Sequence, residues 1–228
     1  MNSFIIKIVS FVIIIPIFGQ IAGFDIYDVD PERKAETIDF LSIHRYEEKT
    51  HSRVYNTFDV KYDGSFILGF DNWFGKRLEV YDPNGNFQYG FSYRGHGGQV
   101  VAWDDDNACI MFYRGDVIVV IDALGNCVEV SNIDNVMSKD YRYRVKELNS
   151  SWRIVNKELY HKENKVGMFL TQGYSLLQKT DLDGNITTLY SADTSSKILY
   201  SGSVIFYVLY FVVFVVTFVK GMLKYYKK

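Results

Sequence analysis

Three stretches of this chain share one pattern and decide its fold: RLEVYDPNGNFQYGF at 77–91, VIVVIDALGNCVEV at 117–130 and SLLQKTDLDGNITTLY at 175–190. In each stretch an apolar run leads into Asp-x-x-Gly-Asn, and a second β-rich run follows. Aspartate at the first position of a type I turn caps that turn, and glycine at the fourth position takes the left-handed conformation of a β-bulge. Each stretch is therefore expected to form a β-hairpin.

More of the unit repeats upstream of each hairpin. A glycine lies seven or eight residues before each turn aspartate, and it follows the apolar runs SFILGF, ACIMFYRG and VGMFLTQG. The pattern predicts three four-stranded antiparallel meanders at about 51–93, 98–131 and 141–191. The turn glycines are spaced 40 and then 59 residues apart, so the third unit carries an insertion of about 19 residues. The weakly patterned WRIVNKELYHKEN places that insertion in 145–165.

A period of about 40–50 residues with four strands per unit is typical of propeller blades. Over roughly 51–191 the chain resembles the blades of NHL-type and other six-bladed β-propellers, whose outer hairpin reads hydrophobic-x-Asp-x-x-Gly-x-hydrophobic. Propellers close with four to eight blades, whereas the motif occurs three times here. An open stack of sheets, closure by a fourth partial blade and completion by a second chain all remain open. The predicted fold class is all-β, with repeated, propeller-like four-stranded meanders between two transmembrane helices.

The charges separate the middle of the chain from its ends. The formal net charge of -2 combines a middle, from Phe24 to Tyr200, that carries -7 with two ends that carry +5 and no acid. An acidic polar domain argues against a nucleic-acid-binding protein. Aromatic residues at 17%, three prolines and two cysteines exclude disordered, collagen-like and disulfide-scaffold classes.

The C-terminal end predicts a membrane span. Residues 198–219 are 22 residues without a charge, and a helix of that length crosses the ~30 Å hydrocarbon core of a bilayer. The basic tail 220–228 holds four lysines and no acid. The positive-inside rule places this tail in the cytoplasm, and the middle domain then lies outside the cytoplasm, at the cell membrane.

The N-terminal segment 1–24 has two interpretations. Lys7 precedes an apolar run that Pro16 interrupts, which fits an uncleaved signal anchor or a signal peptide cleaved near Ala22 or Gly23. The polar connector 25–50 follows, with a possible helix that starts at Pro31, and it could add strands although it lacks the motif. Residues 51–197 then form the extracytoplasmic β-repeat domain.

No catalytic, metal or cofactor motif is found in the sequence. The four histidines are dispersed, and metal-binding, phosphate-binding and nucleophile signatures are missing. The acidic run from Asp104 to Asp106 is interpreted as a solvated turn between two strands rather than a Ca²⁺ site. Cys109 and Cys127 should lie two strands apart, about 9–10 Å, which is beyond the reach of a disulfide. We expect two buried free thiols.

The resemblance to propeller blades implies one face on which loops from successive units gather. That face would carry an aromatic and basic set suited to contact with a protein or a sugar: Trp73, Arg94, His96, Arg114 and Tyr174. The predicted function is a membrane-anchored, non-enzymatic binding or accessory protein. Its partners would be the lipid bilayer and another protein or a second copy of the chain. The alternative is an extracytoplasmic hydrolase or lyase that acts on a polymer through the loop face.

Overall fold

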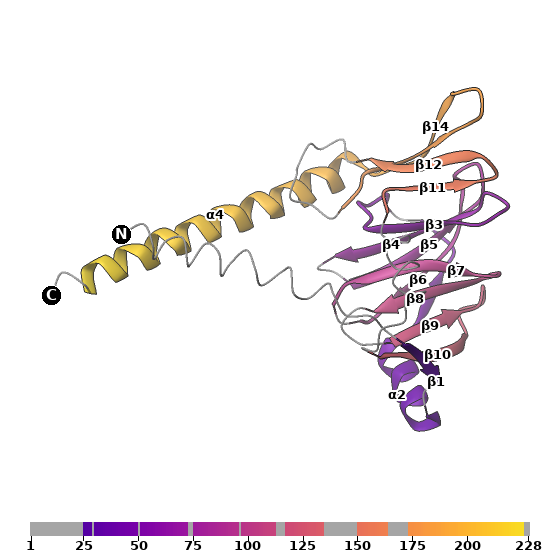
Figure 1. Cartoon of the computed structure of the whole chain (residues 1–228), viewed down its shortest axis with the longest axis horizontal. Coiled ribbons are helices and arrows are strands. Elements are labelled where there is room, and N and C mark those ends of the chain that lie inside the picture. Colours follow the sequence, from indigo (N-terminus) through magenta and orange to yellow (C-terminus); the bar gives the residue numbers. More distant parts are fainter. Residues whose placement is uncertain are drawn as a thin grey trace.

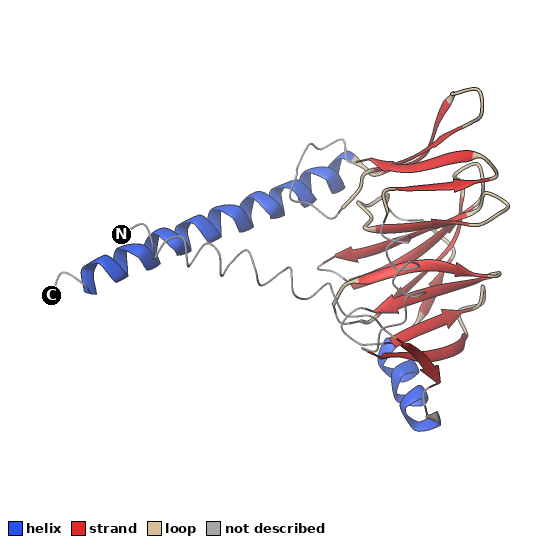
Figure 2. Ribbon diagram, viewed as in Figure 1, coloured by secondary structure: helices blue, strands red, loops and turns tan. Residues whose placement is uncertain are grey.

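A computed structural model describes residues 25–28, 30–49, 51–72, 75–95, 97–112, 117–134, 150–163 and 173–225. The chain is mostly β, as expected, and the described residues form fourteen strands in three antiparallel sheets (Figures 1 and 2). The strands of the first meander are β3 (Thr57–Val60), β4 (Phe66–Asn72), β5 (Gly75–Tyr81) and β6 (Phe87–Tyr93). Those of the second are β7 (Gln99–Asp104), β8 (Asn107–Phe112), β9 (Val117–Ile121) and β10 (Cys127–Asp134). Those of the third are β11 (Trp152–Val155), β12 (Glu158–Glu163), β13 (Leu176–Thr180) and β14 (Ile186–Ser191).

The stretch predicted as a polar connector supplies two further strands and a helix. β1 (Asp25–Asp28) pairs antiparallel with β10, and β2 (His44–Tyr46) pairs antiparallel with β6. Each of the first two meanders therefore becomes a five-stranded sheet, while the third has four strands. Helix α2 (Pro31–Leu41) begins where the sequence predicted, because the Asp30 side chain accepts a hydrogen bond from Arg33 N (3.0 Å) and Pro31 occupies the first turn.

The three Asp-x-x-Gly-Asn turns have the same geometry, which confirms the three hairpins. In each turn one carboxylate oxygen of the aspartate accepts hydrogen bonds from the backbone amides two and four residues later, at 2.8–2.9 Å. The other oxygen accepts from the asparagine side chain at 2.8–3.0 Å. The turn glycines have φ of +87°, +95° and +83°. These hydrogen bonds lower the pKa of all three aspartates, Asp82, Asp122 and Asp181.

The predicted position of the insertion in the third unit is wrong. WRIVNKELYHKEN, assigned to an insertion, forms the hairpin of β11 and β12, which is the first half of the third meander. Asn156 and Lys157 both have positive φ (51° and 67°) at its tip, as a two-residue hairpin turn requires. The stretch that was predicted as the second strand, VGMFLTQG, has its first seven residues outside the described part of the chain.

The sheets stack in the order third, first, second meander. One core joins the third meander to the first and contains Phe58, Phe66, Tyr160 and Leu177. A second core joins the first meander to the second through residues such as Ile67 and Ile110. None of the hydrophobic clusters formed by the described residues contains side chains from both the second and the third meanders. The stack is visible in Figure 1, and the strands that the structure describes form three separate sheets, with no ring closure among them.

Neither cysteine forms a disulfide, and the two lie on opposite faces of one sheet. Cys109 faces a cluster with Met111 and Val120, whereas Cys127 packs against the core shared with the first meander. Cys109 is buried as expected, but Cys127 is only half-buried. The acidic run is a turn, as predicted: Asp105 has φ of +51°, and Asp106 pairs with Lys61.

Helix α4 (Thr194–Tyr225) follows the third meander and extends away from the sheets (Figure 1). It contains the uncharged stretch 198–219, and every side chain from 208 to 219 is exposed. The side chains at 199–201, 203, 204, 207 and 220–225 lie outside the described part of the helix. Within the residues described, no helix is both long enough and apolar enough to cross a membrane. The predicted N-terminal segment 1–24 lies outside the described residues.

Candidate functional site

The structure describes two of the five residues predicted for the loop face. Arg94 is exposed after β6, and its backbone amide donates to the carbonyl of Leu41 at the end of α2 (2.8 Å). Tyr174 is half-buried, and its backbone exchanges two hydrogen bonds with Tyr55 (2.6 and 3.0 Å). The other three predicted residues lie outside the described part of the chain: Trp73, His96 and Arg114. The grouping of the five therefore stays a prediction.

Helix α2 lies beside the loop that carries Arg94, a contact that no sequence pattern predicted. A depression of about 250 Å³ is lined by α2 residues such as Phe40, by Gly95 and by Phe112 and Val117 of the second meander. A β-carbon on Gly95 would lie 2.5 Å from the Phe112 ring. The loop is therefore packed closely against the second sheet.

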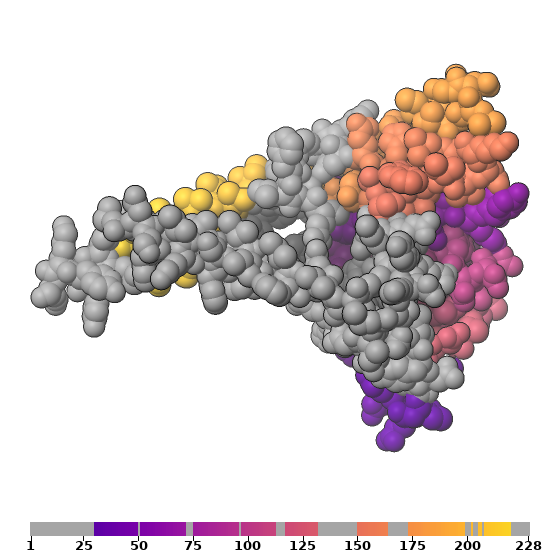
Figure 3. All heavy atoms as spheres, in the orientation of Figure 1, coloured from indigo at the N-terminus to yellow at the C-terminus, as the bar shows by residue number. Residues whose placement is uncertain are grey.

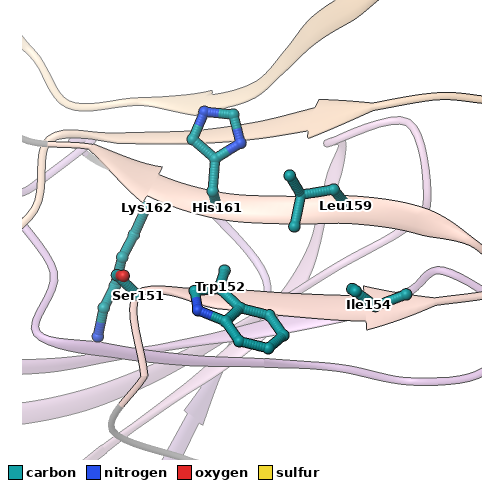
Figure 4. A pocket seen from close by; sticks show the side chains of 6 residues that line it. All are labelled: Ser151, Trp152, Ile154, Leu159, His161 and Lys162. Atoms are coloured by element: carbon teal, nitrogen blue, oxygen red, sulfur yellow. The ribbon is translucent and has the colours of Figure 1, made fainter. Parts of the chain in front are cut away.

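The third meander presents a larger apolar surface on its outer side. Trp152 lies opposite His161 and Ile154 lies opposite Leu159 in the register of β11 and β12, so all four side chains share one face. Figure 4 shows them around a shallow depression of about 490 Å³. Trp152 is 53% exposed and Ile154 is 63% exposed. We call these four residues, together with Ile186 on β14, the Trp152 face.

The Trp152 face carries little charge. His161 is its one ionisable member, and the Nδ1 atom of His161 is buried with no hydrogen-bond partner among the described residues. Exposed aromatic and branched aliphatic side chains on a sheet face are typical of protein contact surfaces. The sequence contained the signal, because W-x-I and L-x-H alternate along the two strands. The assignment of this stretch to an insertion hid it.

The opposite face of β11 and β12 is fixed to the core by a buried ion pair. Asp59 on β3 accepts hydrogen bonds from Arg153 Nε on β11 (3.2 Å) and from Trp103 N on β7 (2.9 Å). One carboxylate thus contacts the first strand of each of the other two meanders. Burial raises the pKa of Asp59, although these hydrogen bonds and the Arg153 charge oppose the shift.

Lys162 lies next to this ion pair. Its ammonium group lies 4.3 Å from the ring centre of Tyr174 and 5.7 Å from that of Phe58. Burial, and after it the charge of Arg153, lower the pKa of Lys162 to about 8. Attraction to the two aromatic faces favours the charged form. The contacts place Tyr174, a predicted binding residue, in the packing between the third and first meanders.

A second buried acid, Glu79 on β5, lies among tyrosines. The hydroxyl of Tyr46 donates to Glu79 Oε1 (3.2 Å), and the hydroxyl of Tyr81 donates to Oε2. Lys49 Nζ lies 4.8 and 4.6 Å from the ring centres of Tyr81 and Tyr190. Burial raises the pKa of Glu79. Through Tyr46 on β2 and Lys49 after it, this network joins β2 and the segment that follows it to the sheet.

The described residues contain no group of three or more His, Cys, Asp or Glu side chains that could hold a metal ion. The comparisons with protein-family models, with curated proteins and with solved structures find no match to this chain.

Proposed function

We propose that this protein is a membrane-anchored, non-catalytic binding protein whose β domain lies outside the cytoplasm and contacts a partner protein through the Trp152 face. The observation that carries the proposal is the exposure of α4. Its large apolar side chains between Val208 and Val219 are 40–65% exposed on the isolated chain. Apolar side chains on all sides of a helix are stable only where lipid or other protein covers them.

The sequence of 198–219 favours lipid as the covering material. Its 22 uncharged residues give a helical length of about 33 Å at ~1.5 Å per residue, which matches the hydrocarbon thickness of a bilayer. The lysines of the tail 220–228 then favour a cytoplasmic C-terminus. On this proposal the segment 1–24 is either a second anchor or a cleaved signal peptide.

The Trp152 face supports the binding role. It lies on the terminal sheet of the stack, and the inner face of the same sheet is already used for the core with the first meander. The exposed part of this patch is rich in Trp and Ile, while the one lysine that lines the depression, Lys162, is buried. Such a composition resembles the buried centre of a protein interface. This composition favours binding to a protein as the role of the face.

Topology is tested by labelling engineered cysteines in intact cells. Leu182, which is 73% exposed in the last turn, is changed to Cys in a Cys109→Ala, Cys127→Ala background. Lys224→Cys in the tail is the matched control. We expect a membrane-impermeant maleimide to label Leu182→Cys in intact cells and Lys224→Cys only after lysis. The reverse result would place the β domain in the cytoplasm and overturn the proposal.

A further inference from the structure

The outermost strand of the third meander, β14, has no paired strand along Ile186–Thr188 among the described residues, whereas the outermost strands of the other two meanders are paired. Past Thr188 the backbone of Leu189 lies against Gly85 in a turn of the first meander, so the open part of the edge is Ile186–Thr188. In the second meander β1 pairs with the outermost strand β10, and in the first meander β2 pairs with β6. Among the described residues, no strand pairs with the corresponding edge of β14. Figures 1 and 3 show the β13–β14 hairpin at the outer limit of the domain.

The sequence of β14 lacks the features that normally protect a sheet edge. β2 has three residues and is followed by Glu47 and Glu48, and β1 has an aspartate at each end. Short, charged strands of this kind resist further pairing. β14 reads ITTLYS, with six residues, no charge and no proline. Ile186 is 63% exposed, and Thr187 and Thr188 are also exposed.

The hydrogen-bond alternation of an antiparallel pair identifies the outward backbone groups. Asp181 N donates to Asn185 O (3.1 Å) where the hairpin closes. Starting from the Asp181–Asn185 pair, hydrogen-bonded and non-hydrogen-bonded residue pairs alternate along the two strands. The pairs Thr180–Ile186 and Gln178–Thr188 are therefore non-hydrogen-bonded. The N–H and C=O groups of Ile186 and Thr188 therefore point away from β13, toward the free edge.

We infer that β14 binds an extended segment of a partner protein as a fifth, antiparallel strand. This inference rests on the proposed function, because it gives the way in which the third meander contacts its partner. The first two meanders provide the precedent, since each already carries such an added strand. Main-chain hydrogen bonds to Ile186 and Thr188 would supply affinity, and side chains that pair with theirs would supply selectivity.

The partner segment should be uncharged and rich in β-branched or aromatic residues. Cross-strand neighbours of Ile186 and Thr188 gain most from such side chains, and the exposed side chains of the Trp152 face beside them, Trp152 and Ile154, are uncharged. A second copy of this chain fits poorly. β14 leads into α4 (Figure 1), so antiparallel pairing of two β14 strands would direct the two α4 helices in opposite directions, against a shared orientation in one bilayer.

Amide hydrogen exchange on the full-length chain tests the inference. The peptide that covers β14 is compared in native membranes and after purification in detergent. We expect the Ile186 and Thr188 amides to exchange about tenfold or more slowly in native membranes. Thr188→Pro removes an outward N–H without removing a bond to β13, and edge strands tolerate such a proline. It should abolish the protection at Ile186, while Thr188→Val, which keeps the N–H, should retain it.

The outcomes separate this inference from the proposed function. Equal exchange in the two preparations, or protection that survives Thr188→Pro, would overturn strand addition. p-Benzoylphenylalanine in place of Trp152 reports on the face in the same membranes. Crosslinking to another protein without edge protection would retain the proposed function and reject the inference. No crosslinking and no protection would reject both, and an adduct with twice the mass of the chain would assign the surface to a second copy. Exchange of core amides such as Leu177 controls for folding.

Discussion

The first and third meanders have the same strand order but very different surroundings. The sheet that contains β3–β6 lies in the middle of the stack, and its two faces contribute to two cores. Its strand β4 has Phe66, Ile67, Leu68 and Phe70 all at 0% exposure. The sheet of β11–β14 is covered on one face. Along β11 exposed residues alternate with buried Arg153.

This difference in burial explains the pattern of apolar and polar residues in each strand. A strand buried on both faces reads as a continuous apolar run, as FILGF does, whereas a strand buried on one face alternates. The alternation in β11 and β12 is further disguised, because Arg153 and Lys162 point inward while Trp152 and Ile154 point outward. The inward charges are accommodated by Asp59 and by the aromatic rings. Polar residues on the core side made this hairpin look like an insertion.

Truncation of a large side chain should give the largest contrast between the two sheets. Phe66 is fully buried and stacks on Tyr81 with ring centres 4.9 Å apart. Phe66→Ala should lower the free energy of unfolding by about 3–5 kcal/mol, because it removes apolar contacts and leaves a cavity. Ile154→Ala, on the exposed face, should change it by less than about 1 kcal/mol. Urea unfolding of the detergent-solubilised chain measures both, and equal losses would contradict the one-sided burial of the third sheet.

The equivalent turn glycines offer a narrower test of the same contrast. Gly85 and Gly184 have nearly the same φ, but a β-carbon on Gly85 would lie 2.3 Å from the carbonyl oxygen of Leu189, whereas one on Gly184 meets nothing within 4 Å. Gly184→Ala should cost about 1–2 kcal/mol, which is the penalty of the left-handed conformation alone. Gly85→Ala should cost about 1–3 kcal/mol more, because backbone must move. Similar unfolding midpoints for the two variants would show that the first turn does not pack on the third meander.

Local turn chemistry made much of the fold predictable from sequence. The three Asp-x-x-Gly-Asn motifs located three hairpins, and the capping pair of Asp30 and Pro31 located α2, because each motif satisfies its own backbone within a few residues. Pairings over long sequence separations were not predictable. No pattern in β1 or β2 predicts that each strand pairs with a strand more than 40 residues away in the sequence. The sequence around Asp59 likewise does not predict its ion pair with Arg153.

The candidate site shows the same difference between local features, which the sequence predicts, and long-range contacts, which it does not. The predicted loop face depended on the relative placement of loops from different meanders, and that placement is a long-range property. Four of the five residues of the Trp152 face lie on a single hairpin, β11–β12, and their alternation is local. It was missed because the third unit was aligned on VGMFLTQG rather than on WRIVNKELYHKEN, which shifted the assignment of its first two strands.

Glu79 in the middle sheet and Asp181 in the third meander should have opposite effects on how the free energy of unfolding changes with pH. Burial raises the pKa of Glu79 above its ordinary 4.5, so the folded protein holds a proton that the unfolded chain has lost, and stability falls as pH rises through that interval. Hydrogen bonds lower the pKa of Asp181 below its ordinary 3.8. Its contribution is therefore present above that pH and is lost on acidification.

Paired variants measure these two slopes separately. Glu79→Gln should flatten the decline in unfolding free energy above about pH 4.5, by at most about 1.4 kcal/mol per pH unit, while it keeps an oxygen that can accept from Tyr46 or Tyr81. Asp181→Asn, which preserves the turn acceptor, should remove a loss that occurs only below about pH 4. Urea unfolding from pH 3 to pH 8 gives both profiles. An accessible carboxylate that accepts hydrogen bonds from two tyrosines would have a lowered pKa, like that of Asp181. If both variants changed the pH profile in the same direction, Glu79 would therefore not be buried in the middle sheet.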